Sequence, residues 1–261
     1  MSAIVDEPRP AQYWESRAAR FAHVDHGLPA ICSYGMPRLY NRAIDLCQRR
    51  TLAPFLDACR GADVLDVGCG VGRWSLPLAR LNRVVGVDLS PTMIDVARQR
   101  AASSGLAARF EVADVTALDL GATFDVVLSV TVLQHVLAED SFDRAIRNLA
   151  AHLKPGGRML LLEVAPFDHG APCRSPVFRP RPLDVYARAL RAAGVRLDTV
   201  VGVDIGPLRP FLLPLLPALP PLVGRAALTA ATLASLPIDL WLSRGSRRSW
   251  HKLLVASRSA A

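Results

Sequence analysis

The sequence predicts an α/β fold built on a seven-stranded, mostly parallel sheet with helices on both faces. Its expected strands are runs that are apolar almost throughout, such as residues 124–130 (F-D-V-V-L-S-V), which is typical of strands buried on both sides. Segments with the helical spacing of apolar residues separate these runs, as in a βαβ series. The chain has 261 residues, of which 51% are hydrophobic and 21% charged, so it can bury a sizeable core.

Seven strands are expected in chain order. They cover residues 63–67, 83–89, 109–115, 124–130, 158–164, 195–203 and 251–256. Helices are expected at 72–79, from Ser90 onward, at 141–153 and at 183–193. Ser90 can accept a hydrogen bond at a helix start, Pro91 suits the first helical position, and Gly194 suits the residue just after a helix.

Four regions follow from this order. Residues 1–60 are expected to form an N-terminal helical cap, because runs with helical spacing begin at Tyr13 and span 39–56. Residues 61–205 form the core, and residues 250–261 supply its last strand. Between them lies an apolar helical insertion, residues 206–249.

Charge and cysteine content exclude several functions. The formal net charge is +8, but the basic residues are almost all scattered arginines, which disfavours nucleic-acid binding. Five cysteines form no C-x-x-C pair, which indicates reduced thiols and a cytoplasmic protein. Residues 1–10 lack the apolar stretch of a secretory signal. No cluster of His, Cys and carboxylates has metal-ligand spacing, so no metal is expected.

A glycine-rich stretch follows the first expected strand. Gly68, Gly70 and Gly72 stand at alternate positions, and glycines let a strand turn sharply into a helix while the backbone lies against a ligand. A dinucleotide fingerprint, G-x-G-x-x-G, would need a glycine where the chain has Arg73. This stretch therefore indicates a ligand loop of a different kind.

Acidic residues stand at defined places around this loop. Asp66 precedes it, Asp88 ends the second strand, and Asp114 follows F-E-V-A in the third. The joint order D-x-G-x-G-x-G, V-D-L-S, A-D-V, F-D-V-V-L-S and L-K-P-G-G resembles the class I S-adenosylmethionine-dependent methyltransferases, in particular small-molecule enzymes like those of ubiquinone and menaquinone biosynthesis. The resemblance is close over residues 60–165 and rests elsewhere on the order of elements. It implies a Rossmann-like fold and S-adenosylmethionine as cofactor.

The resemblance also implies which residues bind the cofactor. The glycine loop would lie against its methionyl and ribose parts, Asp88 would accept both ribose hydroxyls, and Asp114 would contact the adenine amine. Leu89 and Met93 would pack beside the adenosine. The implied set is Asp66, Gly68, Cys69, Gly70, Gly72, Asp88, Leu89, Met93, Asp114, Val115 and Ser129.

His135, just after the fourth strand, stands where this family places substrate-facing residues. An imidazole with a near-neutral pKa suits a general base that takes a proton from the nucleophile, and a purely structural role is the alternative. In the cap, Tyr13, Trp14 and Tyr34 are candidates for the substrate pocket, with packing alone as the alternative.

The expected activity is methyl transfer to a small, largely apolar acceptor, such as a secondary metabolite. Oxygen is the first choice of methylated atom, with nitrogen and carbon open. Residues 129–132 carry neither an N-P-P-F/Y motif nor a Pro-Cys pair, which argues against methylation of nucleic-acid bases. The Asp of metal-dependent catechol methyltransferases is also missing, so metal-independent transfer is expected. A lipid-modifying enzyme at a membrane surface, and a cyclase or accessory protein that transfers no methyl group, are the alternatives. The sequence leaves the oligomeric state open.

The insertion is the part of the chain for which the resemblance implies least. Between residues 210 and 238 its only charged residue is Arg225, and its prolines are expected to interrupt any long helix. No uncharged stretch reaches the length of a membrane span, so a transmembrane segment is not expected. Two interpretations stay open: a cap that walls the substrate pocket, or a surface that makes peripheral contact with a membrane.

Overall fold

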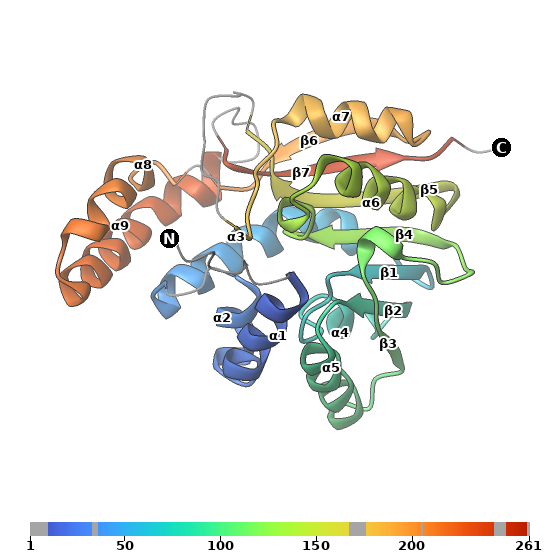
Figure 1. Cartoon of the computed structure of the whole chain (residues 1–261), viewed down its shortest axis with the longest axis horizontal. Helices are drawn as coiled ribbons and strands as arrows, with labels where there is room; N and C mark the ends of the chain where they lie inside the picture. Colours follow the sequence, from blue (N-terminus) through green and yellow to red (C-terminus); the bar gives the residue numbers. More distant parts are fainter. Residues whose placement is uncertain (1–9, 33–35, 167–175, 205, 243–248, 260–261) are drawn as a thin grey trace, which may run out of the picture.

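The computed structural model describes residues 10–32, 36–166, 176–204, 206–242 and 249–259. Its strands are β1 (Asp63–Val67), β2 (Arg83–Asp88), β3 (Ala108–Val112), β4 (Phe124–Val130), β5 (Leu153–Val164), β6 (Arg196–Gly202) and β7 (His251–Ser257). They form one sheet in the order β3-β2-β1-β4-β5-β7-β6 (Figure 1). β7 runs antiparallel to β5 and β6, and the other pairs are parallel. The predicted seven-stranded, mostly parallel Rossmann-like sheet is confirmed.

Helices precede the sheet and connect its strands. They are α1 (Pro10–Phe21), η1 (Asp25–Gly27), α2 (Leu28–Ile31), α3 (Arg38–Leu56), α4 (Ser75–Leu78), α5 (Pro91–Ser103), η2 (Val115–Ala117), η3 (Leu133–His135), α6 (Glu139–Ala151), α7 (Leu183–Ala192), α8 (Arg209–Leu212), η4 (Leu213–Ala218) and α9 (Pro221–Leu242).

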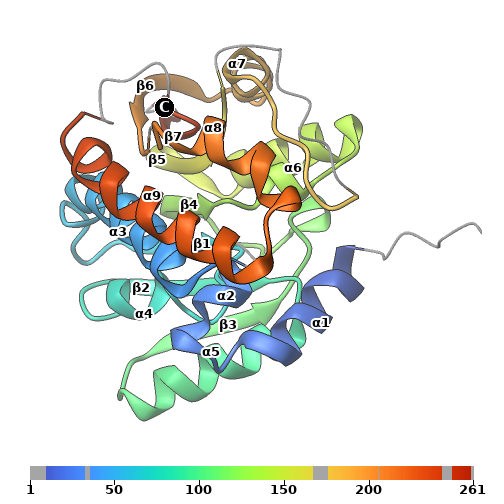
Figure 2. The ribbon, with the colours of Figure 1, turned by 90° about the vertical axis from the view of Figure 1, so that its left-hand side faces the viewer.

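Two hydrophobic clusters cover the two faces of the sheet. On one face α6 and α7 pack against the strands through residues such as Ile146 and Leu190. On the other face α3 and α4 contribute Leu52 and Leu78, and the partly buried Leu236 of α9 joins them. α9 lies alongside α3 (Figure 2). Helices therefore cover both faces, as the unbroken apolar strands predict.

The predicted boundaries hold best for the buried strands. β1 and β4 have the predicted bounds. β3 ends at Val112, because the following residues turn into η2, whose start is capped by Asp114. The helix predicted at 72–79 is only the single turn α4, because the glycine loop continues as turns up to its start. β5 begins at Leu153, five residues before the predicted residue 158.

The prediction that prolines interrupt any long helix of the insertion is wrong. α9 runs for 22 residues, with Pro221 at its start and Pro237 in its last two turns. A proline at the first helical position loses no hydrogen bond, and one near the end of a helix removes a single bond while tertiary packing holds the rest. Judged by length and composition alone, α9 could cross a membrane, although core helices of soluble proteins pass the same test.

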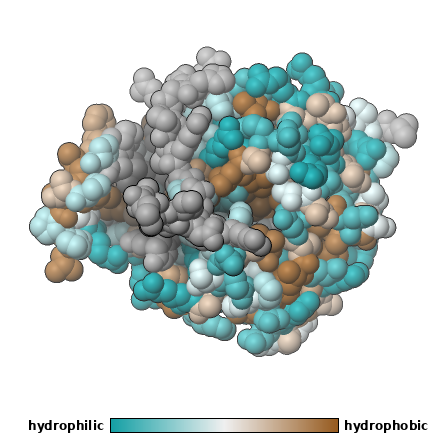
Figure 3. Space-filling view, viewed as in Figure 1, coloured by the Kyte–Doolittle hydropathy of each residue, from teal (hydrophilic) through white to brown (hydrophobic). Residues whose placement is uncertain are grey.

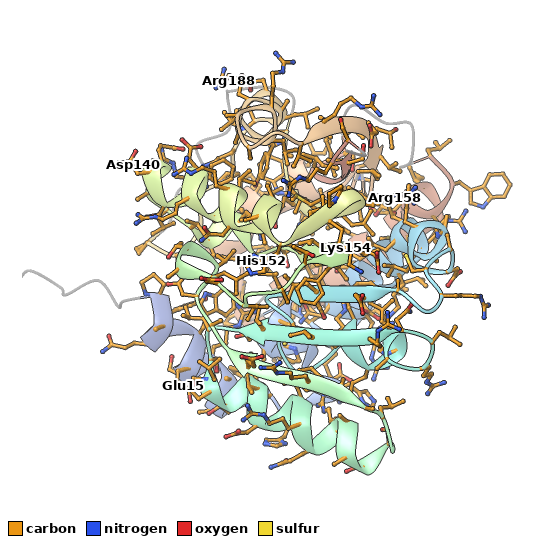
Figure 4. All side chains as sticks on the ribbon, turned by 90° about the vertical axis from the view of Figure 1, so that its right-hand side faces the viewer. Glu15, Asp140, His152, Lys154, Arg158 and Arg188 are labelled. Atoms are coloured by element: carbon orange, nitrogen blue, oxygen red, sulfur yellow. The ribbon has the colours of Figure 1, made fainter. Side chains whose placement is uncertain are left out.

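A charged cluster joins three strands at the sheet edge opposite the glycine loop. Lys154 Nζ lies 2.6 Å from Asp63 Oδ2 and 3.0 Å from Asp125 Oδ2, which links β5 to β1 and β4 (Figure 4). Hydrogen bonds from Arg83 and Lys154 lower the pKa of Asp63 to about 2. The cavity described below opens at the other edge of the sheet, where the parallel strands end.

Candidate functional site

A cavity of about 410 Å³ opens at the carboxyl ends of β1, β2 and β4. The strand order reverses between β1 and β4, and open α/β sheets bind their ligands at such a point. The volume is within the usual range for small-molecule sites. The cavity is lined by the glycine loop, the ends of the strands, α1, α2 and the segment that follows β4.

The glycine loop needs glycine for two reasons. Gly68 and Gly70 have φ angles of 70° and 53°, in the left-handed region that side chains disfavour. A Cβ on Gly68 would lie 2.2 Å from Val132 Cγ2, and one on Gly70 would lie 2.6 Å from Ile31 Cγ2. The loop is therefore packed against both the cap and the segment after β4.

Asp88 is aimed into the cavity by two backbone groups. Its Oδ2 accepts a hydrogen bond from the Gly70 N–H at 2.9 Å, and its Oδ1 accepts one from the Ser90 N–H at 3.0 Å. Burial raises the pKa of this carboxyl, and the same hydrogen bonds oppose the rise. A carboxylate has about four acceptor positions, so Asp88 keeps capacity for ligand hydroxyls.

The side of the cavity predicted to hold adenine contains the expected residues. Leu89, Met93, Asp114 and Val115 all line it. Asp114 Oδ1 accepts a hydrogen bond from the Thr116 N–H at 2.8 Å, which fixes the direction of its carboxyl group. Cys69, in the neighbouring glycine loop, also lines the cavity and is buried.

Three residues of the predicted cofactor set do not line the cavity. Asp66 is 1% exposed and accepts a hydrogen bond from Ser75 Oγ at 2.5 Å beneath the loop, where burial raises its pKa to about 6. Gly72, with a φ of 81°, packs against Leu76. Ser129 is fully buried in β4. Asp66 and Gly72 support the loop from behind, whereas Ser129 packs inside the sheet.

The N-terminal cap supplies one wall. Trp14 and Pro10 of α1 and Ile31 of α2 line the cavity. Tyr13 does not line it and packs edge-on against Trp14, with ring centroids 5.2 Å apart. Tyr34 lies outside the described residues. Of the three predicted pocket residues, the structure thus brings one, Trp14, to the cavity.

A carboxylate fastens this cap to the core. Glu15 of α1 accepts hydrogen bonds from Ser90 Oγ at 2.5 Å and from the Thr92 hydroxyl, at the start of α5 (Figure 4). Burial works against the charged form of Glu15, but these hydrogen bonds outweigh it and lower the pKa. These contacts tie the cap to the segment that follows Asp88.

His135 lines the cavity and is half-buried. Its Nδ1 lies 2.5 Å from the Val177 carbonyl oxygen, which can only accept, so Nδ1 carries the proton and Nε2 is an acceptor, with the Gln134 amide nitrogen 3.4 Å away. The Trp14 ring packs edge-on at 4.8 Å and Phe178 lies at 5.9 Å. Burial lowers the pKa of His135 to about 4. His135 is therefore a neutral hydrogen-bond acceptor at physiological pH.

Glu163, which sequence reasoning missed, holds the segment that carries His135. This fully buried carboxylate of β5 accepts hydrogen bonds from the N–H groups of Val132 and Leu133 at 3.0 Å and of Gln134 at 3.3 Å. Burial raises its pKa to about 7. The signal in the sequence was a lone carboxylate within an otherwise apolar strand.

Arg73 is a second missed wall residue. Its guanidinium forms an ion pair with Asp45 at 2.6 Å, lies 4.6 Å from the centre of the Trp74 ring, and lines the cavity. In the sequence, Arg73 only argued against a dinucleotide-binding loop. Its position directly after Gly72, the last glycine of the loop, was the signal that could have placed it at the cavity.

In the described part of the chain, no group of three or more His, Cys, Asp or Glu side chains is arranged to hold a metal ion.

Comparisons with known proteins agree with this geometry. Residues 64–157 match a family model described as a methyltransferase domain. A ubiquinone biosynthesis O-methyltransferase of Methylocella silvestris is 44% identical over 101 residues, which cover 38% of each chain. The match to these curated relatives spans 38% to 44% of their length.

Solved structures share the fold over nearly the whole chain. A magnesium protoporphyrin IX methyltransferase from Synechocystis PCC 6803 with bound SAM has a TM-score of 0.60 at 18% identity, covering 99% of this chain and 100% of that one. A putative sarcosine dimethylglycine methyltransferase from Galdieria sulphuraria has a TM-score of 0.67 at 17% identity, covering 95% and 99%.

The fold and the site define a nucleoside-cofactor domain of the Rossmann-like type. Residues 64–157, at its centre, match a methyltransferase domain, and this match and the curated relatives bear out the predicted resemblance to class I S-adenosylmethionine-dependent methyltransferases. The Synechocystis enzyme of this fold holds SAM, which agrees with the predicted cofactor, S-adenosylmethionine. The residues present fit this molecule: a carboxylate with spare acceptor positions, a glycine-rich loop, and a pocket of Leu89, Met93 and Val115 beside Asp114 lie in one cavity.

Proposed function

We propose that this protein transfers a methyl group to the oxygen of a small, largely apolar acceptor. The observation that carries the proposal is the continuity of one cavity, which runs from Asp88 and the glycine loop to an apolar wall with His135 in it. Val130, Val132 and Leu137 line this second part. When bound, S-adenosylmethionine supplies an activated methyl group, and the protein supplies binding and orientation.

His135 is proposed to orient the nucleophile. Its unprotonated Nε2 can accept a hydrogen bond from an acceptor hydroxyl in place of the long contact with Gln134 Nε2, and it can take up the hydroxyl proton during transfer. Oxygen is favoured because a neutral acceptor nitrogen in His135 pairs naturally with a hydroxyl donor, and because the relative from Methylocella silvestris is named as an O-methyltransferase. Transfer is proposed to need no metal, since positioning and proton uptake are both available from side chains.

Cofactor binding is tested with Asp88→Ala. Loss of a carboxylate that accepts two hydroxyls should weaken S-adenosylmethionine binding by about 100-fold or more, as measured by calorimetry. Asp95→Ala, an exposed carboxylate in the second turn of α5, is the matched control and should bind as the wild type does. Wild-type protein that fails to bind at millimolar cofactor would contradict the proposal.

Methyl transfer is tested separately from binding. Wild-type protein is incubated with cofactor and a panel of phenols, quinols and other apolar hydroxyl compounds, and release of S-adenosylhomocysteine is measured with and without a chelator. We expect acceptor-dependent release that the chelator leaves unchanged. Tight cofactor binding without release on any acceptor would indicate the alternative, a protein of this fold that transfers no methyl group.

A further inference from the structure

The face that α9 turns toward the rest of the protein is its more polar one. Its buried positions, spaced by three or four residues, are Gly224, Leu228, Thr232, Ser235 and Asp239. Leu228 packs against Tyr40 and Ile44 of α3. Asp239 Oδ1 accepts a hydrogen bond from the Gly206 N–H at 2.7 Å. A helix of a soluble protein usually shows the reverse arrangement, with polar residues outward.

The opposite face of α9 is apolar and exposed. Leu222 is 82% exposed and Trp241 is 85% exposed, near the two ends of the helix. Phe211 and Leu215, in α8 and η4, extend the same kind of surface at 75% and 57% exposure. The apolar ridge consists of Phe211, Leu215, Leu222, Val223, Leu233, Ile238, Trp241 and Leu242. Figure 3 shows hydrophobic side chains gathered over α8 and α9 at the left-hand end of the molecule.

This ridge is separate from the cavity. Among the described residues of the insertion, none lines the cavity, so the expected cap over the substrate pocket is not formed by them. The ridge therefore needs an explanation other than contact with cofactor or acceptor.

The charged residues of the insertion that carries the ridge are nearly all basic. Residues 206–249 contain five arginines and one acidic residue, Asp239, which is 3% exposed. Three of the arginines, Arg244, Arg247 and Arg248, fall within the six residues that follow Leu242 in the sequence. Anionic lipid attracts such basic flanks, and tryptophan favours the boundary between headgroups and hydrocarbon.

We propose that the apolar ridge docks on the surface of a bilayer that contains anionic lipid, with α9 lying in the interface. A crossing orientation would detach α9 from α3 and take Asp239 and Arg225 into hydrocarbon, which is costly. In the interfacial orientation the polar face keeps its present contacts and only the ridge enters the membrane. The inference does not depend on transferase activity.

A second copy of the chain is the competing occupant. Two copies that meet through the same ridge would bring two sets of arginines together without exposed acidic partners in the insertion. Like charges across an interface oppose association, whereas an anionic surface favours the same residues. The charge pattern thus favours lipid.

The test is co-sedimentation of the whole protein with vesicles. We expect binding to vesicles of phosphatidylcholine with phosphatidylglycerol, weaker binding to phosphatidylcholine alone, and loss of the difference in high salt. The double variant Leu222→Gln with Trp241→Gln should lower the partition coefficient by about 100-fold, because two large apolar side chains no longer enter the membrane. Its affinity for S-adenosylmethionine should be unchanged, which shows that the fold is intact.

A matched control has two exposed apolar residues away from the ridge. Leu81 and Val112 are 52% and 50% exposed, and Leu81→Gln with Val112→Gln should bind vesicles as the wild type does. Absence of binding to anionic vesicles, equal binding to neutral ones, or full binding by the ridge variant would overturn the proposal. A dimer in solution that the ridge variant dissociates would overturn it too, in favour of a second copy.

Discussion

Burial shifts the pKa values of Asp88 and His135, two polar groups of one cavity, in opposite directions. It raises the pKa of the Asp88 carboxyl and lowers the pKa of the His135 imidazole to about 4. In both groups the neutral form gains, since a charge is poorly solvated there. The N–H groups of Ser90 and Gly70 counteract this at Asp88, and the Val177 carbonyl does so at His135. The residues were predictable from sequence, but their charge states depend on these neighbours.

The rate of methyl transfer should depend little on pH between about 5 and 8. A general base acts in its unprotonated form, and the lowered pKa of about 4 keeps His135 unprotonated over this range. The measurement is S-adenosylhomocysteine release against pH with an accepted substrate. His135→Ala should lower kcat by about 100-fold or more while cofactor affinity changes little.

His23→Ala, at an exposed position before η1, is the control for this experiment. A wild-type rate that rises with a midpoint near the ordinary histidine value would contradict the assigned environment. An unaltered rate in His135→Ala would show that His135 is structural.

At the scale of the element, the glycine loop combines a local and a tertiary requirement. The local one is a positive φ, which the alternating glycines make visible in the sequence. The tertiary one is the close approach of Val132 to Gly68 and of Ile31 to Gly70, which are 64 and 39 residues apart in the chain and meet only through the fold. No pattern within the loop itself predicts these contacts.

Gly68→Ala should abolish cofactor binding and destabilise the protein by about 3 kcal/mol. The substitution adds the strain of a side chain at positive φ to a clash of 2.2 Å with Val132, which displaces the segment carrying His135. Gly105→Ala is the matched control, because its φ is 63° and nothing lies within 4 Å of the added Cβ. It should cost about 1 kcal/mol and leave binding intact, as measured by urea unfolding and calorimetry. Equal effects of the two substitutions would contradict the tertiary requirement.

At the scale of the whole molecule, carboxyl groups at the two edges of the sheet have pKa values that are shifted in opposite directions. Burial raises the pKa of Asp66 to about 6 and that of Glu163 to about 7, both close to the carboxyl edge. At the opposite edge, hydrogen bonds from Arg83 and Lys154 lower the pKa of Asp63 to about 2. The first two carboxyls stabilise the fold when protonated, and the third does so when ionised.

The free energy of unfolding should therefore fall as pH rises from about 4.5 to about 7. In this range the folded pKa values of Glu163 and Asp66 lie above their unfolded values, so the folded protein holds protons that the unfolded chain has lost; the lowered pKa of His135 offsets part of this fall, and the two carboxyls outweigh it. Urea unfolding at pH 5 and pH 8 measures the difference. Glu163→Gln removes one titrating group and should reduce it, whereas Asp140→Asn, an exposed carboxylate of α6, should not (Figure 4). A protein that becomes more stable from pH 5 to pH 8 would contradict this assignment.

The sequence by itself determined the sheet, the glycine loop and the acidic residues at the strand ends. These features depend on interactions within a few residues of the chain: apolar runs, positive φ at glycine, and the fixed place of a residue at the end of a strand. Only the tertiary structure decided that Ser129 and Asp66 face away from the cavity, that Glu163 holds the segment of His135, and that α9 turns its apolar face outward. Composition alone cannot give the direction of a helix face, because packing partners distant in the chain choose which side is buried.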